Sequence, residues 1–387
     1  MKFLFASDSF KGSLSSEKII ELLTKTAKEV FPDCETLGIP MADGGEGTTA
    51  AVLACTGGRW QEVTVRGPLG KPVTARYGIC PGREAVMEMA GASGLPLVPV
   101  KERDPRRTGT WGTGEMIADA LARGIRRITI AIGGSATNDG GMGALTALGV
   151  RFLDAEGREL SGCGADLGKV AAIDASGLLP AVRETQFTVM CDVDNPLLGP
   201  DGATWTFGAQ KGASEAVQRE LEAGMVHYAG CLQAFLGAPS VDTVNFPGAG
   251  AAGGLGAALK TFLHAELKSG VETVLDLVGF DRLLDGVDCV ITGEGRIDWQ
   301  SAHGKVISGV AAHCRKNEIP VIALVGSMGK NAEKTYECGI RTILPIVEGP
   351  VSLEEAMEKA ETLYEGAARR MFRLLQIGIG MKKQNKK

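Results

Sequence analysis

Several features that would assign a class at once are missing from this chain of 387 residues. Its nine cysteines are scattered singly and form no CxxC pair, which is typical of reduced thiols rather than of a disulfide framework. No apolar run approaches the roughly 20 residues that a membrane span needs, and the apolar stretch at residues 3–6 is too short for a signal peptide. We therefore expect a cytoplasmic protein with no membrane partner.

An excess of positive charge is also missing. Lysine and arginine total 41 against 46 acidic residues, which gives a net charge of −5. No long basic stripe occurs outside residues 381–387, a lysine-rich stretch that we expect to be a solvated tail. This argues against a nucleic-acid partner. The chain has no GxxxxGK[ST] motif and no GxGxxG after the first expected strand, so it is neither a P-loop enzyme nor a simple dinucleotide-binding one.

Glycine, in contrast, is abundant. It supplies 54 of the 387 residues, about twice the usual share of roughly 7%. The excess lies in turns that also carry an acid or a hydroxyl, at residues 8–13, 41–48, 133–141, 191–199, 248–256 and 292–298. Such turns let backbone N–H groups approach an anion, and a following helix adds its dipole. Carboxylates beside them suggest a metal held between protein and phosphate. The set predicts a phosphate-handling enzyme.

The hydrophobic patterns predict an α/β fold with two domains. Strands are expected at 2–7, 35–40, 127–132, 288–292, 320–325 and 341–346, most of them followed by helices, with Ser15 as an N-cap. The alternation on either side of residues 67–70 instead predicts a hairpin. We expect a Rossmann-like parallel α/β domain made from both chain ends, residues 1–62 and 285–387. A second α/β domain, residues 63–284, is inserted, with an active-site cleft between the two.

The first two strand-to-helix loops carry candidate site residues. Asp8, Ser9 and Lys11 follow the first strand, where α/β sheets bind ligands. We assign catalytic roles to Asp8 and Lys11 and substrate contact to Ser9; an ordinary surface lysine is the alternative. Asp43 is predicted to bind magnesium or a substrate hydroxyl, whereas Glu46 fits a helix N-terminal acid equally well.

The GGSATNDGG segment is the best candidate for nucleotide phosphates, because a strand leads into it and a helix follows. The residues assigned to the nucleotide are Gly133, Gly134, Ser135, Thr137 and Asn138. Asp139, with Asp43, is assigned to the metal. The alternatives are an ordinary turn capped by Asn138 or Asp139, and a loop that binds substrate instead of nucleotide.

Asp192 and Asp194 stand two residues apart on a segment expected to be extended, so both carboxylates face the same side. A carboxylate is the usual base for an alcohol acceptor in kinases. We predict that Asp192 is the base and that Asp194 binds substrate, although the Asp-Asn-Pro sequence also fits a simple turn.

The TGEGRID segment supplies an arginine whose planar fork suits a carboxylate or phosphate. Arg296 is therefore predicted to be catalytic, with Glu294 and Asp298 binding substrate. A structural ion pair between Arg296 and one of these acids is the alternative. His303 remains open as a base.

These segments together resemble the type-1 glycerate kinases of bacteria, in the order that family uses and over nearly the whole chain. The segments are DSFKGS, PMADGGEGT, GTGE, GGSATNDGG, DNPLLGP, QKGA, PGAGAAGGLGAAL and TGEGRID. The resemblance implies transfer of the γ-phosphate of ATP to D-glycerate, with Mg²⁺, and favours the 2-phosphate product over the 3-phosphate. It also implies the split two-domain fold. The chain departs from the family pattern at Trp299, Ser301 and Ala302, which leaves another small sugar acid as an alternative acceptor.

Two rival functions use the same turns. One is a nicotinamide or sugar-phosphate enzyme that works without ATP, and the other is a non-catalytic sugar-acid sensor. Release of ADP that depends on glycerate separates the kinase from both. The sequence gives no prediction of the oligomeric state.

Overall fold

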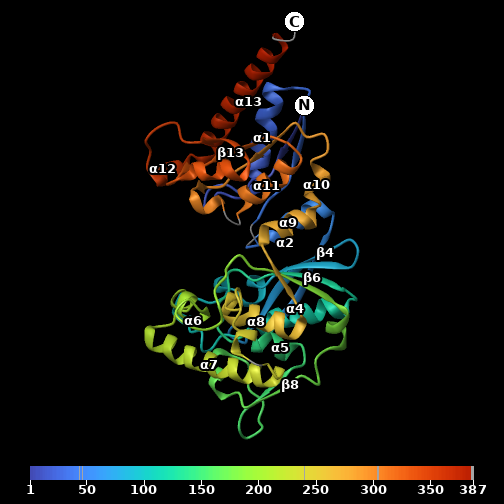
Figure 1. Ribbon diagram of the computed structural model, residues 1–387, viewed down its shortest axis with the longest axis vertical. Helices are drawn as coiled ribbons and strands as arrows, with labels where there is room; N and C mark the ends of the chain where they lie inside the picture. The colour runs from blue at the N-terminus through green and yellow to red at the C-terminus, as the bar shows by residue number, and fades with distance from the viewer. Residues whose placement is uncertain (43, 46, 239, 303–304, 385–387) are drawn as a thin grey trace. The chain divides into compact units, whose positions relative to one another are not determined.

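The computed structural model describes residues 1–42, 44–45, 47–238, 240–302 and 305–384. The chain divides into two compact units. Unit 1 joins Met1–Asp43 to Val271–Lys387, and unit 2 is Gly44–Gly270. In Figure 1, unit 1 combines the blue start of the chain with its orange and red end. Each unit contains helices and a sheet with parallel pairings, so the predicted α/β class is confirmed.

Unit 1 is built on a five-stranded sheet in which each pairing is parallel. Its order is β15-β13-β11-β1-β2, with bounds β1 Lys2–Phe5, β2 Glu35–Gly38, β11 Cys289–Thr292, β13 Val321–Val325 and β15 Ile340–Pro345. All five residues of β13 are buried, as in a strand covered on both faces. A short parallel pair, β12 Arg296–Ile297 and β14 Ser327–Met328, follows β11 and β13. The central pairing of β1 with β11 therefore joins the two ends of the chain.

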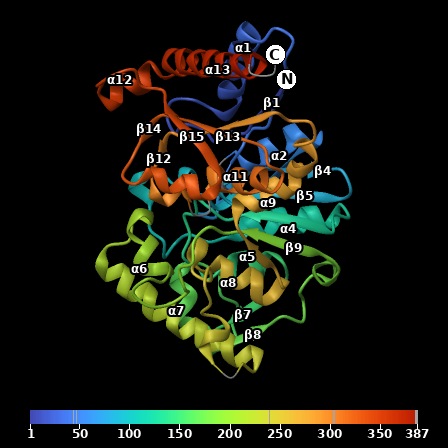
Figure 2. The same cartoon turned by 45° about the horizontal axis from the view of Figure 1, so that its top comes forward.

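The helices of unit 1 complete a core that both chain segments share. They are α1 Ser16–Val30, α9 Gly270–Val278, α10 Phe280–Leu283, α11 Val306–Lys316, α12 Leu353–Glu358 and α13 Ala360–Gln384. The side chain of Ser15 accepts a hydrogen bond from the amide of Lys18, which confirms the predicted N-cap. Helices α1 and α13 lie side by side (Figure 2), and Phe372 meets Phe3 edge-on with ring centroids 5.2 Å apart.

Unit 2 is built on a six-stranded mixed sheet of order β10-β9-β6-β5-β4-β3. The bounds are β3 Arg59–Arg66, β4 Pro72–Cys80, β5 Glu84–Glu88, β6 Arg127–Ala131, β9 Gln186–Met190 and β10 Glu266–Lys268. β3 and β4 form the predicted antiparallel hairpin. The pairings among β5, β6, β9 and β10 are parallel. Away from this sheet, β7 Arg151–Leu153 pairs with β8 Ala172–Asp174.

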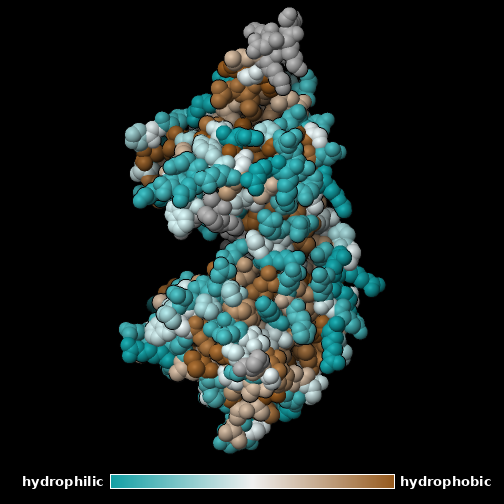
Figure 3. Space-filling model, viewed as in Figure 1, coloured by the Kyte–Doolittle hydropathy of each residue, from teal (hydrophilic) through white to brown (hydrophobic). Residues whose placement is uncertain are grey.

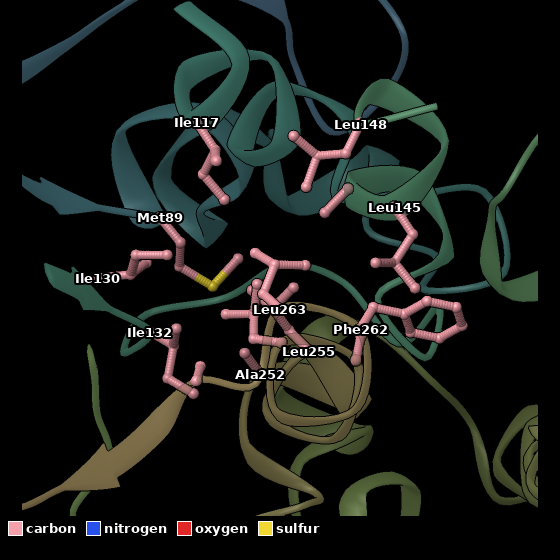
Figure 4. Close-up of a cluster of buried hydrophobic side chains, with 14 of the residues drawn as sticks. Met89, Ile117, Ile130, Ile132, Leu145, Leu148, Ala252, Leu255, Phe262 and Leu263 are labelled. Carbon is pink, nitrogen blue, oxygen red and sulfur yellow. The ribbon is translucent and has the colours of Figure 1, made fainter. Parts of the chain in front are cut away.

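Helices α4, α5 and α8 enclose the core of unit 2 with strand β6 (Figure 4). The helices of this unit are α2 Thr48–Thr56, α3 Ala90–Ser93, α4 Trp111–Ala122, α5 Met142–Ala147, α6 Ala203–Phe207, α7 Glu215–Leu236 and α8 Ala251–Leu263. The buried side chains labelled in the figure are Met89, Ile117, Ile130, Ile132, Leu145, Leu148, Ala252, Leu255, Phe262 and Leu263. Ile132, the first residue after β6, belongs to this core.

The division into units falls at Asp43/Gly44 and Gly270/Val271, whereas the sequence placed the junctions near residues 62 and 285. Helix α2 belongs to unit 2 because it packs on β4, where a Cβ on Gly78 would lie 2.9 Å from Leu53 and Thr49. Helix α9 packs on α11 of unit 1. A Cβ added to Gly309 of α11 would lie 2.4 Å from Val271 of α9. The expected cleft between domains stays a prediction.

Residues 381–387 were expected to be a solvated tail. Helix α13 continues to Gln384, so residues 381–384 of that stretch are helical. Apolar surface gathers at its outer end (Figure 3), where Leu374, Ile377 and Met381 are exposed. These residues are spaced three and four apart, so they lie on one face of the helix.

Candidate active site

The loops that follow β1 and β11 lie together at one edge of the unit 1 sheet. The amide of Asp8 donates to the carbonyl of Gly293 at 2.9 Å, and Thr292 Oγ1 donates to the carbonyl of Ala6 at 2.7 Å. Because β1 and β11 are parallel neighbours, their carboxyl ends meet at the same edge. This edge therefore brings the predicted residues 8–11 beside the predicted residues 294–298.

The first loop presents a cation beside a short hydrogen-bonded turn. Asp8 Oδ1 accepts from the amide of Ser9 at 2.7 Å, and the amide of Ser13 closes the turn onto the carbonyl of Phe10. Lys11 is exposed, while Asp8 and Ser9 are half-buried. The geometry leaves the ammonium of Lys11 accessible to a ligand at this edge.

Glu294 is nearly buried and faces inward. Its Oε2 accepts from Lys305 Nζ at 3.1 Å, and its Oε1 is buried with no hydrogen-bond partner. Burial raises the pKa of Glu294, although Lys305 and Ser301 oppose that shift. The ion-pair partner of Glu294 is thus Lys305 rather than Arg296. Glu294 positions a lysine instead of presenting its own carboxylate at the surface.

Lys305 is a functional candidate that the sequence reasoning did not select. It precedes helix α11 and lies 3.5 Å from Ser301 Oγ as well as beside Glu294. A usable signal was present, because a lysine just before a predicted helix is well placed for an anion. The edge of unit 1 therefore holds a further cation.

Arg296 and Asp298 lie on the segment that leaves β11. Arg296 is exposed on β12, which pairs with β14, so its guanidinium stands on a short ordered strand. Asp298 is half-buried, and its amide donates to Ser301 Oγ at 3.2 Å. Trp299, one of the residues that depart from the family pattern, is 46% exposed.

The edge of unit 2 is formed by the carboxyl ends of β5, β6 and β9. The parallel register pairs Glu88 with Ala131 and Ala131 with Met190, so the segments that follow them start at the same level. These segments contain the loop 133–141 and the pair Asp192 and Asp194. The backbone of Gly44 and Gly45 lies next to Gly133, where an added Cβ would be 3.7 Å away.

The loop 133–141 has an exposed first half and a buried second half. Gly133 and Gly134 are exposed and Ser135 is half-buried, whereas Thr137, Asn138 and Asp139 have no exposed surface. Only the first half is accessible to a phosphate. Thr137 and Asn138, which we predicted to touch nucleotide, belong to the interior.

Asp139 is a structural anchor. Its carboxylate accepts from the amide and hydroxyl of Thr110, both at 2.7 Å, and from the amides of Gly141 and Gly143 at 3.0 and 3.2 Å. Burial raises the pKa of Asp139, and these hydrogen bonds oppose the shift. With all of these protein donors and no exposed surface, Asp139 holds the loop to α4 and α5, and we replace its expected metal role with this one.

The GAGAAGGLG segment packs against the same loop. Ala252, Gly253 and Gly254 have positive φ angles at the start of α8, and a Cβ on Gly253 would stand 2.1 Å from the carbonyl oxygen of Thr137. These glycines are required for close approach of two backbones. They shape the loop from behind.

Asp192 and Asp194 are exposed at the end of β9. Asp192 Oδ1 accepts from the amide of Gly270 at 2.9 Å, which orients its carboxylate at the sheet edge. Asp43, Glu46 and His303, to which roles were also given, lie outside the described residues.

A further carboxylate at this edge, Glu88, was missed. Glu88, the last residue of β5, accepts from the amide of Thr49 at 2.7 Å and from the amide of Gly47 at 3.4 Å. It therefore caps the start of α2 with negative charge. An acid at the carboxyl end of a parallel strand is the pattern that would have revealed it.

The two edges define an α/β enzyme whose candidate ligand loops follow the carboxyl ends of parallel strands. The chain matches the glycerate kinase family over residues 3–376, and it belongs to that family. The resemblance seen in the sequence is thereby confirmed. A kinase family implies a nucleotide substrate.

Similar proteins cover almost the whole chain. A glycerate kinase from Bacillus subtilis (strain 168) is 48% identical over 370 residues, covering 95% of this chain and 96% of the relative. A glycerate 2-kinase from Escherichia coli (strain K12) is 45% identical over 380 residues, covering 98% and 99%. A crystal structure from Salmonella typhimurium LT2, provisionally assigned as glycerate kinase 2, aligns with a TM-score of 0.87 at 41% identity, covering 98% and 99%.

The described residues contain no helix that combines the length and apolar character needed to cross a bilayer.

Proposed function

We propose that the chain transfers the γ-phosphoryl group of ATP to the 2-hydroxyl of D-glycerate, giving 2-phosphoglycerate and ADP. The observation that carries this proposal is the family match over residues 3–376. The similarity to a protein named glycerate 2-kinase supports the position of transfer.

In unit 2, the exposed first half of the loop 133–141 binds the nucleotide phosphates. Gly133 and Gly134 carry no side chain that would keep an anion from their backbone, and Ser135 adds a hydroxyl. Asp139 acts behind them by fixing the loop's course. The support is the accessibility of residues 133–135 at the carboxyl end of β6.

Asp192 is the general base. A carboxylate that accepts the proton of the attacking hydroxyl is what transfer to an alcohol requires. The amide of Gly270 orients Asp192, and the side chain is exposed to a ligand.

In unit 1, Lys11 and Arg296 supply positive charge. The planar fork of Arg296 suits the carboxylate of glycerate, and Lys11 suits a phosphate oxygen. Asp8 orders the loop around Ser9, which contacts substrate together with Asp298. Glu294 holds Lys305, which adds to the positive charge of this edge.

Magnesium, when it binds with ATP, would neutralise phosphate charge. Within the described ranges, no group of three or more His, Cys, Asp and Glu side chains could hold a metal ion. A nucleotide-bound Mg²⁺ needs only one or two protein carboxylates. Asp194, an exposed carboxylate on the segment that follows β9, has that donor chemistry.

The direct test incubates the protein with ATP, Mg²⁺ and D-glycerate and identifies the product by ³¹P NMR. We expect ADP formation that depends on D-glycerate and a 2-phosphoglycerate resonance, with L-glycerate as the control. Absence of glycerate-dependent ADP would overturn the kinase proposal, and 3-phosphoglycerate would overturn the position. Faster turnover of another short hydroxy acid would favour the alternative acceptor.

A further inference from the structure

Lys211 is a buried lysine that the proposed reaction does not use. It ends the short helix η5, Ala209–Lys211, and only 2% of its surface is exposed. Its Nζ donates to the carbonyl oxygen of Thr137 at 2.7 Å. The side chain therefore ties the QKGA segment to the buried half of the loop 133–141.

The Lys211 ammonium lies near an aromatic ring and in the field of a buried carboxylate. The ring centroid of Phe207 lies 6.0 Å from Nζ, and Gly253 packs against the same Thr137 carbonyl. Asp139 is the charged group whose field acts on Lys211, and Tyr228 is the other titratable side chain that faces Asp139. Burial lowers the pKa of Lys211 to about 8, although Asp139 opposes the shift.

The buried half of the loop has polar atoms that no protein group satisfies. Thr137 Oγ1 and Asn138 Oδ1 are buried without hydrogen-bond partners. Such atoms destabilise a buried segment. Lys211 is one of several groups that hold this segment in place. Asn138 Nδ2 also donates to Thr204 Oγ1 at 3.2 Å, and the amide of Gly140 donates to the carbonyl of Gly253 at 2.9 Å.

We propose that Lys211 is a positioning residue for nucleotide binding: by fixing the Thr137 carbonyl it sets the course of the loop whose exposed residues 133–135 receive the phosphates. This inference rests on the proposed function of that loop. Lys211 itself touches no phosphate in this proposal, because only 2% of its surface is exposed.

The test compares Lys211→Met and Lys211→Arg with the matched control Lys169→Met, a largely exposed lysine of the same unit that pairs with Asp166. Lys211→Met is expected to raise the KM for ATP and the Kd for a fluorescent ADP analogue by about tenfold, because the loop that receives the phosphates loses the hydrogen bond that fixes its Thr137 carbonyl. The KM for glycerate should stay within about twofold, since the proposed function assigns no glycerate contact to this loop. Lys169→Met should match the wild type.

The pH dependence gives a second measure. In the wild type the KM for ATP should rise above about pH 8, where Lys211 loses its charge. Lys211→Arg should restore most of the affinity and flatten that rise, because a guanidinium stays protonated.

A folded Lys211→Met enzyme with the wild-type KM for ATP overturns the inference. If Lys211→Met does not fold, an unchanged alkaline rise in Lys211→Arg overturns it. The proposed function fails separately, when the wild type releases no glycerate-dependent ADP; binding of the ADP analogue still decides the role of Lys211 in that case.

Discussion

The two candidate edges use different means to prepare for an anion. At the edge of unit 1, charged side chains stand at the surface, as Lys11 and Arg296 do, or are held by a partner, as Lys305 is by Glu294. At the edge of unit 2, the accessible residues of the phosphate loop are glycines and a serine, and the charges Asp139 and Lys211 are buried behind them.

This difference predicts whether a substitution should change ligand binding or the stability of the fold. Side-chain charge at a surface contributes to binding with little effect on folding, since exposed ionic groups add little stability. A loop shaped by close backbone approach depends on packing. Substitutions in it should therefore lower the free energy of unfolding before they change substrate binding. The predictions that follow, from the largest expected effect to the smallest, separate these two behaviours.

Asp192→Asn should reduce kcat by about 10²–10⁴-fold, the usual contribution of a general base. Affinity for ATP should be retained, because removing a base spares ground-state contacts. Steady-state kinetics check this, with Asp201→Asn, an exposed aspartate of the same unit, as the control. Unchanged turnover would place the base elsewhere, with Asp8 as the next candidate.

Gly253→Ala should destabilise unit 2 by about 3 kcal/mol, from a strained positive φ together with a steric clash. The new Cβ would lie 2.1 Å from the Thr137 carbonyl oxygen. Gly237→Ala is the matched control, because its φ is also positive but its Cβ would meet nothing within 4 Å. The control should cost about 1 kcal/mol. Urea unfolding measures both, and equal losses would contradict the role given to Gly253.

Arg296→Ala should raise the KM for glycerate by about tenfold while leaving the melting temperature unchanged, because a charge-assisted contact is lost from an exposed position. Arg296→Lys should recover part of the affinity. Lys11→Ala should weaken the KM for one substrate and slow turnover as well. A fall in melting temperature without a change in KM would make Arg296 a structural residue.

The smallest effect concerns pH and the packing of unit 1. His313 is buried on α11, with Nδ1 2.7 Å from Asp281 and Nε2 3.1 Å from Glu272. Burial lowers the pKa of His313, but the two carboxylates prevail and raise it overall. The stabilisation is therefore complete below the ordinary histidine pKa of about 6.5 and is lost as the pH rises through the higher folded value.

His313→Gln should accordingly lose more stability at pH 6 than at pH 9, measured by thermal unfolding at both. Asp276→Asn, an exposed residue on the neighbouring helix α9, serves as the control. A loss that is equal at the two pH values would show that the histidine acts by shape alone.

Local patterns predicted the local elements well. The hairpin of β3 and β4 follows from strict alternation around a glycine-proline turn, and the start of α1 follows from Ser15. Both depend on residues close in the sequence. Burial of Thr137 and Asn138 was not predictable in this way, because the groups that enclose them come from residues 204, 211 and 253.

The sequence by itself determined the α/β class, the family and the loops that carry the candidate chemistry, because these follow from hydrophobic period and from short ordered motifs. Only the tertiary structure decided which members of a motif reach the surface. Asp139 and Gly253 lie in glycine-rich segments that we expected to bind ligands. In the structure, Asp139 accepts hydrogen bonds that fix the loop, and Gly253 lets its backbone approach that of Thr137. The physical reason is that the solvent exposure of a loop residue depends on segments distant in sequence that pack behind the loop. A local sequence pattern does not specify which segments these are.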